Sequence, residues 1–394
     1  MEALETFRAE TRAWLEENCP PAMRTGMPEE ERVWGGRNAT FKNPDSKVWM
    51  DRMVERGWTV PTWPKEYGGG GLSRDEAAVL GEEMGRLKCR VPLFSFGISM
   101  LGPVMLKYGT DEQKAEHLPP IARGEIRWCQ GYSEPGAGSD LASLQTRAED
   151  QGDHYLVNGQ KIWTSYAHLA DWIFCLVRTD TSTKHAGISF LLFDMASPGV
   201  ETKPIALISG TSFFCETFFD NVQVPKRNLI GKLNGGWETA KQLLQHERGM
   251  ISQIGRAIGG QVPPVDVAAK KYLGDENGII SDSGLRDAVA QHVMNDRAFG
   301  LTIKRAAQES EAGTASGGAS SMFKYYGTEQ NKKKFELIMK CAGTNALGWE
   351  GDGFDDDELM LNRTWLRSKG NSIEGGTSEI QLNVIAKRVL ELPD

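Results

Sequence analysis

One glutamate is placed where a general base could act. On a helix over residues 236–258, the positions three, four and seven away from Glu247 share its face. Those positions are all apolar: Ala240, Leu243, Leu244, Met250, Ile251 and Ile254. A carboxylate on such a face is partly desolvated, which raises its pKa toward the range that proton abstraction needs. The competing interpretation is a structural glutamate paired with Arg248 or Arg256. Arg248 points to another side of the helix and could meet a ligand phosphate.

Two glycine-rich segments could bring backbone N–H groups close to a ligand. Residues 134–140 read EPGAGSD, in which two glycines and a serine permit close approach. Residues 374–381 read EGGTSEIQ, where two glycines precede a helix whose first N–H groups suit a phosphate or an electron-rich ring edge. Each has a simpler interpretation. The first is then an ordinary turn, and the second a terminal helix with a capping box of Ser378 and Gln381.

Several other kinds of site are excluded by the sequence. No GxGxxG motif follows a strand and there is no GxxxxGK[ST] motif, which removes Rossmann and P-loop nucleotide sites. His246-Glu247 begins like HExxH, but the fifth position is Met250. The six histidines lack the spacing of metal ligands, so a metal site is not expected.

Three segments of different periodicity must position these residues. The helices expected in the first are residues 2–17, 46–57, 73–87 and 110–123, the last two opened by capping boxes. The strand-like runs expected in the second are 154–164, 171–177, 187–193 and 215–224, the first interpreted as a hairpin that turns at Asn158-Gly159. The helices expected in the third are 236–258, 283–311, 318–341 and 377–391, with loops at 273–282 and 350–358. The order is helices, a small β domain, then helices.

Composition restricts the class of protein. The 394 residues exceed one ordinary domain, and 45 basic against 53 acidic residues give a formal charge of −8 with no long basic run, which argues against nucleic acid. Six scattered cysteines without a CxxC pair indicate reduced thiols and a cytoplasmic location. The acidic N-terminal segment is unlike a signal or transit peptide, and no apolar run reaches the length of a membrane span.

The motifs together resemble those of the acyl-CoA dehydrogenase family. WCQGYSEPGAGSD (128–140), LVNGQKIWTS (156–165) and EGGTSEIQLNVIAKRVL near the end occur in the family's order and spacing, and the resemblance spans essentially the whole chain. It implies an α+β multidomain fold. Residues 1–126 would form an N-terminal helical domain, 127–233 a central antiparallel β-barrel or sandwich, and 234–394 a C-terminal four-helix bundle.

The resemblance also implies a cofactor, FAD, and the residues that hold it. Carried over by position, the cofactor-binding residues are Gln130, Tyr132, Ser133, Gly138, Ser139, Trp163, Thr164, Ser165, Thr377 and Glu379, with Ser139 and Arg248 also at the acyl-CoA substrate. The implied reaction is α,β-dehydrogenation in fatty acid β-oxidation, with electrons passed to an electron-transfer flavoprotein. The implied assembly is a homotetramer or homodimer. An acyl-CoA oxidase, a flavin monooxygenase or a non-catalytic subunit of the same fold are the alternatives.

The family uses two locations for its catalytic base. Many members carry a glutamate directly before Gly-Thr in the closing motif, where this chain has Gly375, with Glu374 one residue earlier. Others, related to isovaleryl-CoA dehydrogenase, place it before an arginine on the first bundle helix, as in Glu247-Arg248. We therefore expect Glu247 to be the base, with Glu374 as the alternative. Residues 270–285 also lack the R-x-x-F-G-like segment whose arginine reaches a neighbour's FAD, so a heteromer of unlike chains stays open.

Overall fold

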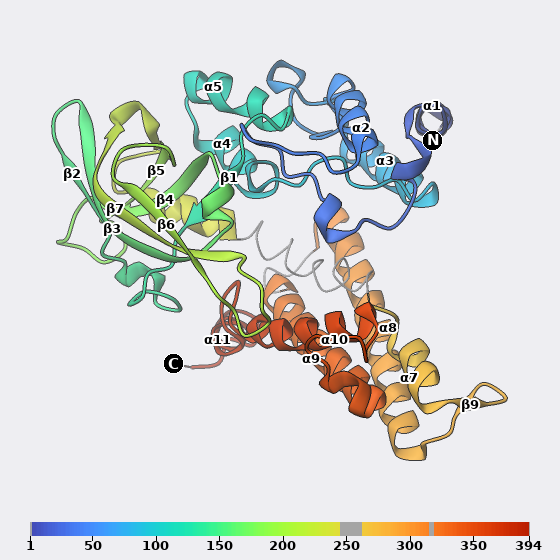
Figure 1. Ribbon diagram of the computed structural model, residues 1–394. Coiled ribbons are helices and arrows are strands. Elements are labelled where there is room, and N and C mark those ends of the chain that lie inside the picture. Colours follow the sequence, from blue (N-terminus) through green and yellow to red (C-terminus); the bar gives the residue numbers. More distant parts are fainter. Residues whose placement is uncertain (1, 245–261, 315–318, 394) are drawn as a thin grey trace. The chain divides into compact units, whose positions relative to one another are not determined.

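The computed structural model describes residues 2–244, 262–314 and 319–393 (Figure 1). The chain divides into two compact units. Unit 1 is Met1–Ile205 with Phe213–Leu243, and unit 2 is Ala206–Ser212 with Leu244–Asp394. Each unit is described by itself. The order of helices, β domain and helices predicted from the sequence is confirmed.

The first helices of unit 1 begin and end largely where local signals place them. They are α1 (Glu2–Asn18), α2 (Pro44–Glu55), α3 (Arg74–Arg86), α4 (Gly102–Tyr108) and α5 (Asp111–Ala122). The predicted capping boxes, at Ser73 before α3 and at Thr110 before α5, are both formed. Helix α2 begins two residues before the predicted position, because Asn43 caps the Asp45 N–H and a proline suits the first turn.

A mixed sheet makes up the β domain of unit 1. Its strands are β1 (Trp128–Gly131), β2 (Arg147–Asp150), β3 (His154–Ser165), β4 (Trp172–Arg178), β5 (Ile188–Asp194), β6 (Val200–Ile205), β7 (Phe214–Pro225) and β8 (Leu229–Ile230). Their order is β6-β7-β3-β2-β4-β5-β8, with β1 beside β4. Most neighbours are antiparallel, as predicted, whereas β1 and β2 both pair with β4 in parallel.

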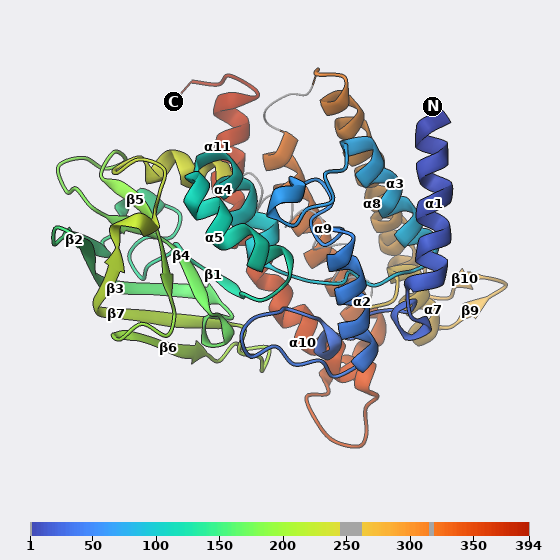
Figure 2. The same ribbon diagram turned by 90° about the horizontal axis from the view of Figure 1, so that it is seen from above.

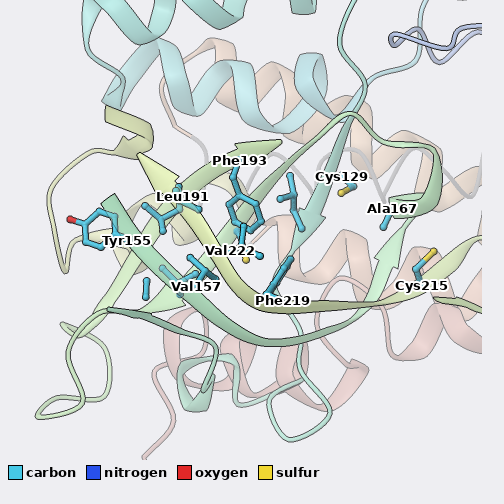
Figure 3. Close-up of a cluster of buried hydrophobic side chains, with 14 residues drawn as sticks. Cys129, Tyr155, Val157, Ala167, Leu191, Phe193, Cys215, Phe219 and Val222 are labelled. Atoms are coloured by element: carbon cyan, nitrogen blue, oxygen red, sulfur yellow. The ribbon is translucent and has the colours of Figure 1, made fainter. Parts of the chain in front are cut away.

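Side chains from strands near both edges of this sheet meet in one apolar core (Figure 3). Phe193 of β5 packs edge-on against Phe219 of β7, with their ring centroids 5.2 Å apart, and Leu191 and Val222 join them. Six of the seven residues in β4 and six of the seven in β5 are buried, so these strands are covered on both faces. That explains why their sequences are continuous apolar runs without alternation.

The hairpin predicted at Asn158-Gly159 is wrong. Strand β3 continues through both residues from His154 to Ser165 and pairs with β7 along its length. Gly159 is needed for a different reason, since a Cβ there would lie 2.7 Å from the Thr146 Cα. Asn158 accepts a 2.8 Å hydrogen bond from the Asn221 N–H on β7. The dipeptide marks a β-bulge with close backbone approach, as glycines inside strands often do.

Unit 2 is a bundle of helices around α9. Its elements are α7 (Val265–Leu273), β9 (Asp275–Glu276), β10 (Ile279–Ile280), α8 (Ser283–Glu311), α9 (Ala319–Ala342), α10 (Asp356–Ser368) and α11 (Ser378–Arg388). Helix α9 packs against α7, α8, α10 and α11. The segment predicted as a loop at 273–282 contains a small hairpin, β9–β10, which projects beyond the end of α7 in Figures 1 and 2.

Helix α10 was not predicted. Its N-cap Asp355 and Glu358 form a capping box inside the acidic stretch that was expected to be a loop. Residues 236–244 at the start of the first bundle helix are helical, as expected. Among the described residues, no helix is long and apolar enough to cross a membrane.

Candidate active site

Two segments of unit 1 that carry predicted site residues lie side by side. The N–H of Ile162 on β3 donates a 2.9 Å hydrogen bond to the carbonyl oxygen of Ser133, which follows β1. The sheet therefore brings the segment 130–139 next to the segment 163–165. This contact joins two segments that are distant in sequence, and both carry residues predicted to bind the cofactor.

Trp163 occupies a strained position on β3. Its φ of 59° lies in the left-handed region, which bulky residues rarely adopt. The pairing with β7 shifts between Lys161 and Thr164, so a β-bulge interrupts the ladder at the tryptophan. The indole stays 52% exposed and touches Phe214 edge-on, with 5.9 Å between centroids. A strained bulge that holds a large ring toward open space is a feature of functional sites.

A buried ion pair in unit 1, between Lys161 and Glu134, holds the first residue of the 134–140 loop. Lys161 is completely buried and donates hydrogen bonds to Glu134 Oε1 (2.7 Å) and to the Tyr132 carbonyl (3.0 Å). Glu134 also accepts from the backbone N–H groups of Gln145 (2.6 Å) and Thr146 (2.9 Å). Burial alone would raise the pKa of Glu134, but the Lys161 charge and these hydrogen bonds outweigh it and lower that pKa. The loop therefore begins from a fixed point.

The other predicted residues of unit 1 differ in accessibility. Gln130 and Ser133 are half-buried, whereas Gly138 and Ser139 are exposed in the loop. The Tyr132 ring is buried and meets Phe174 and Phe190 edge-on. Thr164 is completely buried, in contrast to its neighbours Trp163 and Ser165. Its side chain is therefore less accessible to the predicted cofactor than theirs are.

In unit 2, the predicted site residues lie in and beside the first turn of α11. Thr377 is the N-cap, and its Oγ1 accepts a 3.2 Å hydrogen bond from the Ile380 N–H. The predicted capping box of Ser378 and Gln381 is wrong: Ser378 donates to Glu329 on α9, and Gln381 Nε2 donates to the Gly375 carbonyl. Gly375 and Gly376 have φ values of 67° and 89°, which only glycine adopts readily. The predicted Glu379 is exposed in this first turn.

The alternative base, Glu374, is already engaged by other side chains. Its Oε2 accepts a 2.7 Å hydrogen bond from Arg367 on α10, and its Oε1 accepts one of 2.5 Å from the Asn371 amide. Both carboxylate oxygens of Glu374 are therefore occupied by side-chain hydrogen bonds within unit 2. The preferred base, Glu247, and its neighbour Arg248 lie outside the described residues. Ala240 and Leu243, two of the apolar residues that the sequence pattern groups with Glu247, are completely buried.

Comparison with known proteins covers the chain from end to end. Family models for the N-terminal, middle and C-terminal domains of acyl-CoA dehydrogenase match residues 1–125, 129–222 and 234–390. The chain belongs to the acyl-CoA dehydrogenase family. It is therefore an oxidoreductase that acts on CH–CH groups.

The chain is similar over its full length to other acyl-CoA dehydrogenases, one of them named as a steroid ACAD. Acyl-CoA dehydrogenase IpdE1 of Mycobacterium tuberculosis is 34% identical over 400 residues, covering 100% of this chain and 99% of the relative. The solved Tcur3481-Tcur3483 steroid ACAD is 30% identical with a TM-score of 0.78, covering 100% and 98%. The ChsE4-ChsE5 complex from Mycobacterium tuberculosis is 30% identical with a TM-score of 0.75, covering 100% and 98%.

The residues present in this acyl-CoA dehydrogenase fit the FAD that the family implies. Ser133 and Ser165 are half-buried and Ser139 is exposed, so their hydroxyls offer three polar groups to a ligand. A Cβ added at Gly136 or Gly138 would meet no atom within 4 Å, so the loop borders open space. The exposed indole of Trp163 offers an apolar wall of the kind on which a flat ring stacks.

Two lysines that organise this acyl-CoA dehydrogenase were not recognised from the sequence. Lys161 supports the loop of unit 1, and Lys324 of α9 is completely buried beneath the segment before α11. A lysine inside a strand or helix pattern carries no local sign of burial, because lysines are mostly exposed. The available signal for Lys161 was its place inside the LVNGQKIWTS motif.

Proposed function

We propose that this chain is an FAD-dependent dehydrogenase of bulky, steroid-like acyl-CoA thioesters that uses Glu247 as its base. The support for the substrate class is the full-length similarity to a steroid ACAD at 30% identity. The observation that carries the choice of base is the engagement of Glu374 by Arg367 and Asn371. The position that bears the base in many relatives is Gly375, which has no side chain.

The residues of each unit have distinct parts in this proposal. In unit 1, Gln130, Ser133, Ser139 and Ser165 supply polar contacts to FAD, and Trp163 supplies the apolar wall. In unit 2, Thr377 presents the first turn of α11, whose N–H groups and dipole favour electron-rich atoms. Bound FAD supplies a two-electron oxidant that accepts the β-hydrogen as hydride. In this proposal Glu247, which the sequence pattern predicts on an apolar helical face, removes the α-proton.

A pair of variants tests the choice of base. Glu247→Gln should retain FAD and slow anaerobic flavin reduction by about a thousandfold, the usual size of a general-base contribution. Glu374→Gln, the matched variant, should reduce within about tenfold of the wild type. The opposite ranking would assign the base to Glu374. Equal rates for wild type and Glu247→Gln would remove Glu247 from the mechanism.

The substrate class is tested with the purified protein and a panel of acyl-CoAs without oxygen. Straight-chain, branched, aromatic and steroid-derived thioesters are added, and the visible flavin absorbance is followed. Bleaching by the steroid-derived members supports the proposal, and selective bleaching by straight-chain members contradicts the substrate class. Repeating the reaction with oxygen and without an electron-transfer flavoprotein distinguishes an oxidase, since only an oxidase then turns over.

A second candidate function is one subunit of a heteromeric dehydrogenase. The observation in its favour is the β9–β10 hairpin at residues 275–280, inside the region that lacks the family's R-x-x-F-G-like segment. Two of the similar structures bear the names of two chains, Tcur3481-Tcur3483 and ChsE4-ChsE5. Light scattering and the flavin-to-protein ratio of the chain purified alone test this. A homotetramer with one FAD per chain supports a homomer, whereas a chain that takes up FAD only with a co-expressed partner supports the heteromer.

A further inference from the structure

The segment between α10 and α11 is irregular, yet it is held by an extensive polar network from α9. Lys369–Ser372 forms a short 3-10 turn, and the two left-handed glycines follow before the Thr377 cap. Gly376 has a φ of 89°, a conformation in which a residue with a side chain would be strained. The segment forms hydrogen bonds within itself, such as that from the Glu374 N–H to the Gly370 carbonyl, and side chains of α9 add further ones.

Asn371 is the centre of that network. Its carbonyl oxygen accepts a 3.0 Å hydrogen bond from Lys324 Nζ, and its Oδ1 accepts one of 2.9 Å from Asn331 Nδ2. Its own amide donates to Glu374. Lys324 and Asn331 are seven residues apart on α9 and therefore lie on one face of the helix. One residue of the segment thus connects α9 to the carboxylate that precedes the glycines.

A second point of attachment lies beside the first. Glu329 Oε1 accepts hydrogen bonds from Ser372 (2.9 Å) and Ser378 (3.1 Å), on either side of the glycine pair. Lys332 donates to Glu329 at 3.0 Å and also to Ser372. The two hydroxyls share one carboxylate oxygen, so the segment before the glycines and the first turn after them have a common anchor. Helix α9 packs against α10 and α11 as a single support (Figure 1).

Burying the charged side chain of Lys324 costs folding free energy. It is completely buried, and among the described residues the hydrogen bond found for its ammonium is the one to the Asn371 carbonyl. Burial lowers the pKa of its ammonium, and the nearby charges of Glu374 and Glu329 partly offset that effect. A buried cation without a direct carboxylate partner weakens stability more than an apolar residue of similar size would. Its hydrogen bond to the Asn371 carbonyl therefore points to a role in placing the segment.

We propose that Lys324 is a positioning residue that, through Asn371, fixes Gly375, Gly376 and Thr377 in the orientation in which the first turn of α11 receives the flavin. This rests on the proposed function, in which Thr377 contacts FAD. Lys324 touches neither cofactor nor substrate in this role. It acts through the backbone of Asn371, while Asn331 and Glu329 set the tilt of the same segment.

Lys324→Met tests the role, because it keeps the length of the side chain and removes the charge and the donor. Lys369→Met is the matched control, since Lys369 lies in the same segment and, among the described residues, its ammonium contacts half-buried Glu336 and the Trp365 ring. Each apoprotein is first checked by thermal unfolding. FAD affinity is then measured from the quenching of flavin fluorescence, together with the visible circular dichroism of the bound flavin.

The expected result is an apoprotein that still unfolds cooperatively, with FAD affinity weakened about tenfold or more and an altered flavin dichroism. Lys369→Met should match the wild type in both readouts. Unchanged affinity and dichroism in folded Lys324→Met would overturn the proposal. If Lys324→Met does not fold, Asn331→Ala decides instead: affinity about threefold weaker with altered dichroism supports the role, and wild-type values overturn it. A wild-type chain that binds no FAD, either alone or with a co-expressed partner, would contradict the proposed function itself, a result distinct from either.

Discussion

The ammonium of Lys161 and the carboxylate of Glu134 lie 2.7 Å apart inside unit 1, with 0% and 7% of their side chains exposed. The pair joins β3 to the start of the EPGAGSD loop, and two backbone N–H groups complete the shell of the carboxylate. An ion pair this deep contributes little net stability compared with an apolar pair, but it defines where the loop begins. Removing one partner leaves the other charge buried and unpaired.

Glu134→Gln should therefore destabilise the apoprotein by about 3 kcal/mol, because Lys161 keeps its charge inside the sheet. The free energy of unfolding from urea titrations at pH 7 measures the loss. Glu149→Gln is the matched control, since Glu149 is exposed on β2 and its ion pair with Arg147 is long, at 3.9 Å, and open to solvent. That variant should stay within about 0.5 kcal/mol of the wild type. Equal losses in the two variants would show that the buried pair has no special role.

The buried carboxyl of Glu83 should make the stability of the helices in unit 1 depend on acid pH. The Arg12 guanidinium, together with Arg86 and Arg8, lowers the pKa of this buried carboxyl from 4.5 to about 2. A carboxyl whose pKa is lower in the folded state stabilises the fold above its unfolded pKa, and that contribution disappears as the pH falls through its folded pKa.

The advantage of the wild type over Glu83→Gln should therefore be about 2 kcal/mol at pH 7, a figure reduced for the partial exposure of the three arginines. It should shrink between pH 4.5 and pH 2. Unfolding free energies of the two proteins across that range measure the difference. A gap that is constant with pH would mean that the glutamine only disturbs packing.

Local signals were sufficient for many helix ends but not for the strands. The capping boxes at Ser73 and Thr110 were predicted correctly, because each depends on a side chain and a backbone N–H within four residues. Asn158-Gly159 has the same local appearance as a hairpin turn, yet the backbone of Thr146 requires the glycine there. Only the folded sheet brings Thr146 to that position, so the sequence pattern alone favoured the wrong structure.

The motifs of the candidate site were found in the sequence, but the groups that support them were not. Trp163 and the segment 134–140 stand out by composition and by their resemblance to the family. Lys161 and Lys324 bond to partners 27 and 47 residues away, and nothing near either lysine indicates those partners. The engagement of Glu374 by Arg367 was equally invisible, although the two are only seven residues apart, because it depends on the 3-10 turn between them.

Trp163 allows backbone strain and ring contact to be separated. Trp163→Ala and Trp163→Gly both remove the indole, but only alanine keeps a Cβ at a φ of 59°. Left-handed backbone costs a non-glycine residue about 1 kcal/mol, so the glycine apoprotein should be more stable than the alanine apoprotein by about that amount. Both should bind FAD more weakly than the wild type, since each lacks the apolar wall. Thermal unfolding and flavin fluorescence measure the two effects. If alanine proves as stable as glycine, the bulge is not strained; if both retain wild-type FAD affinity, the exposed indole does not contact the flavin.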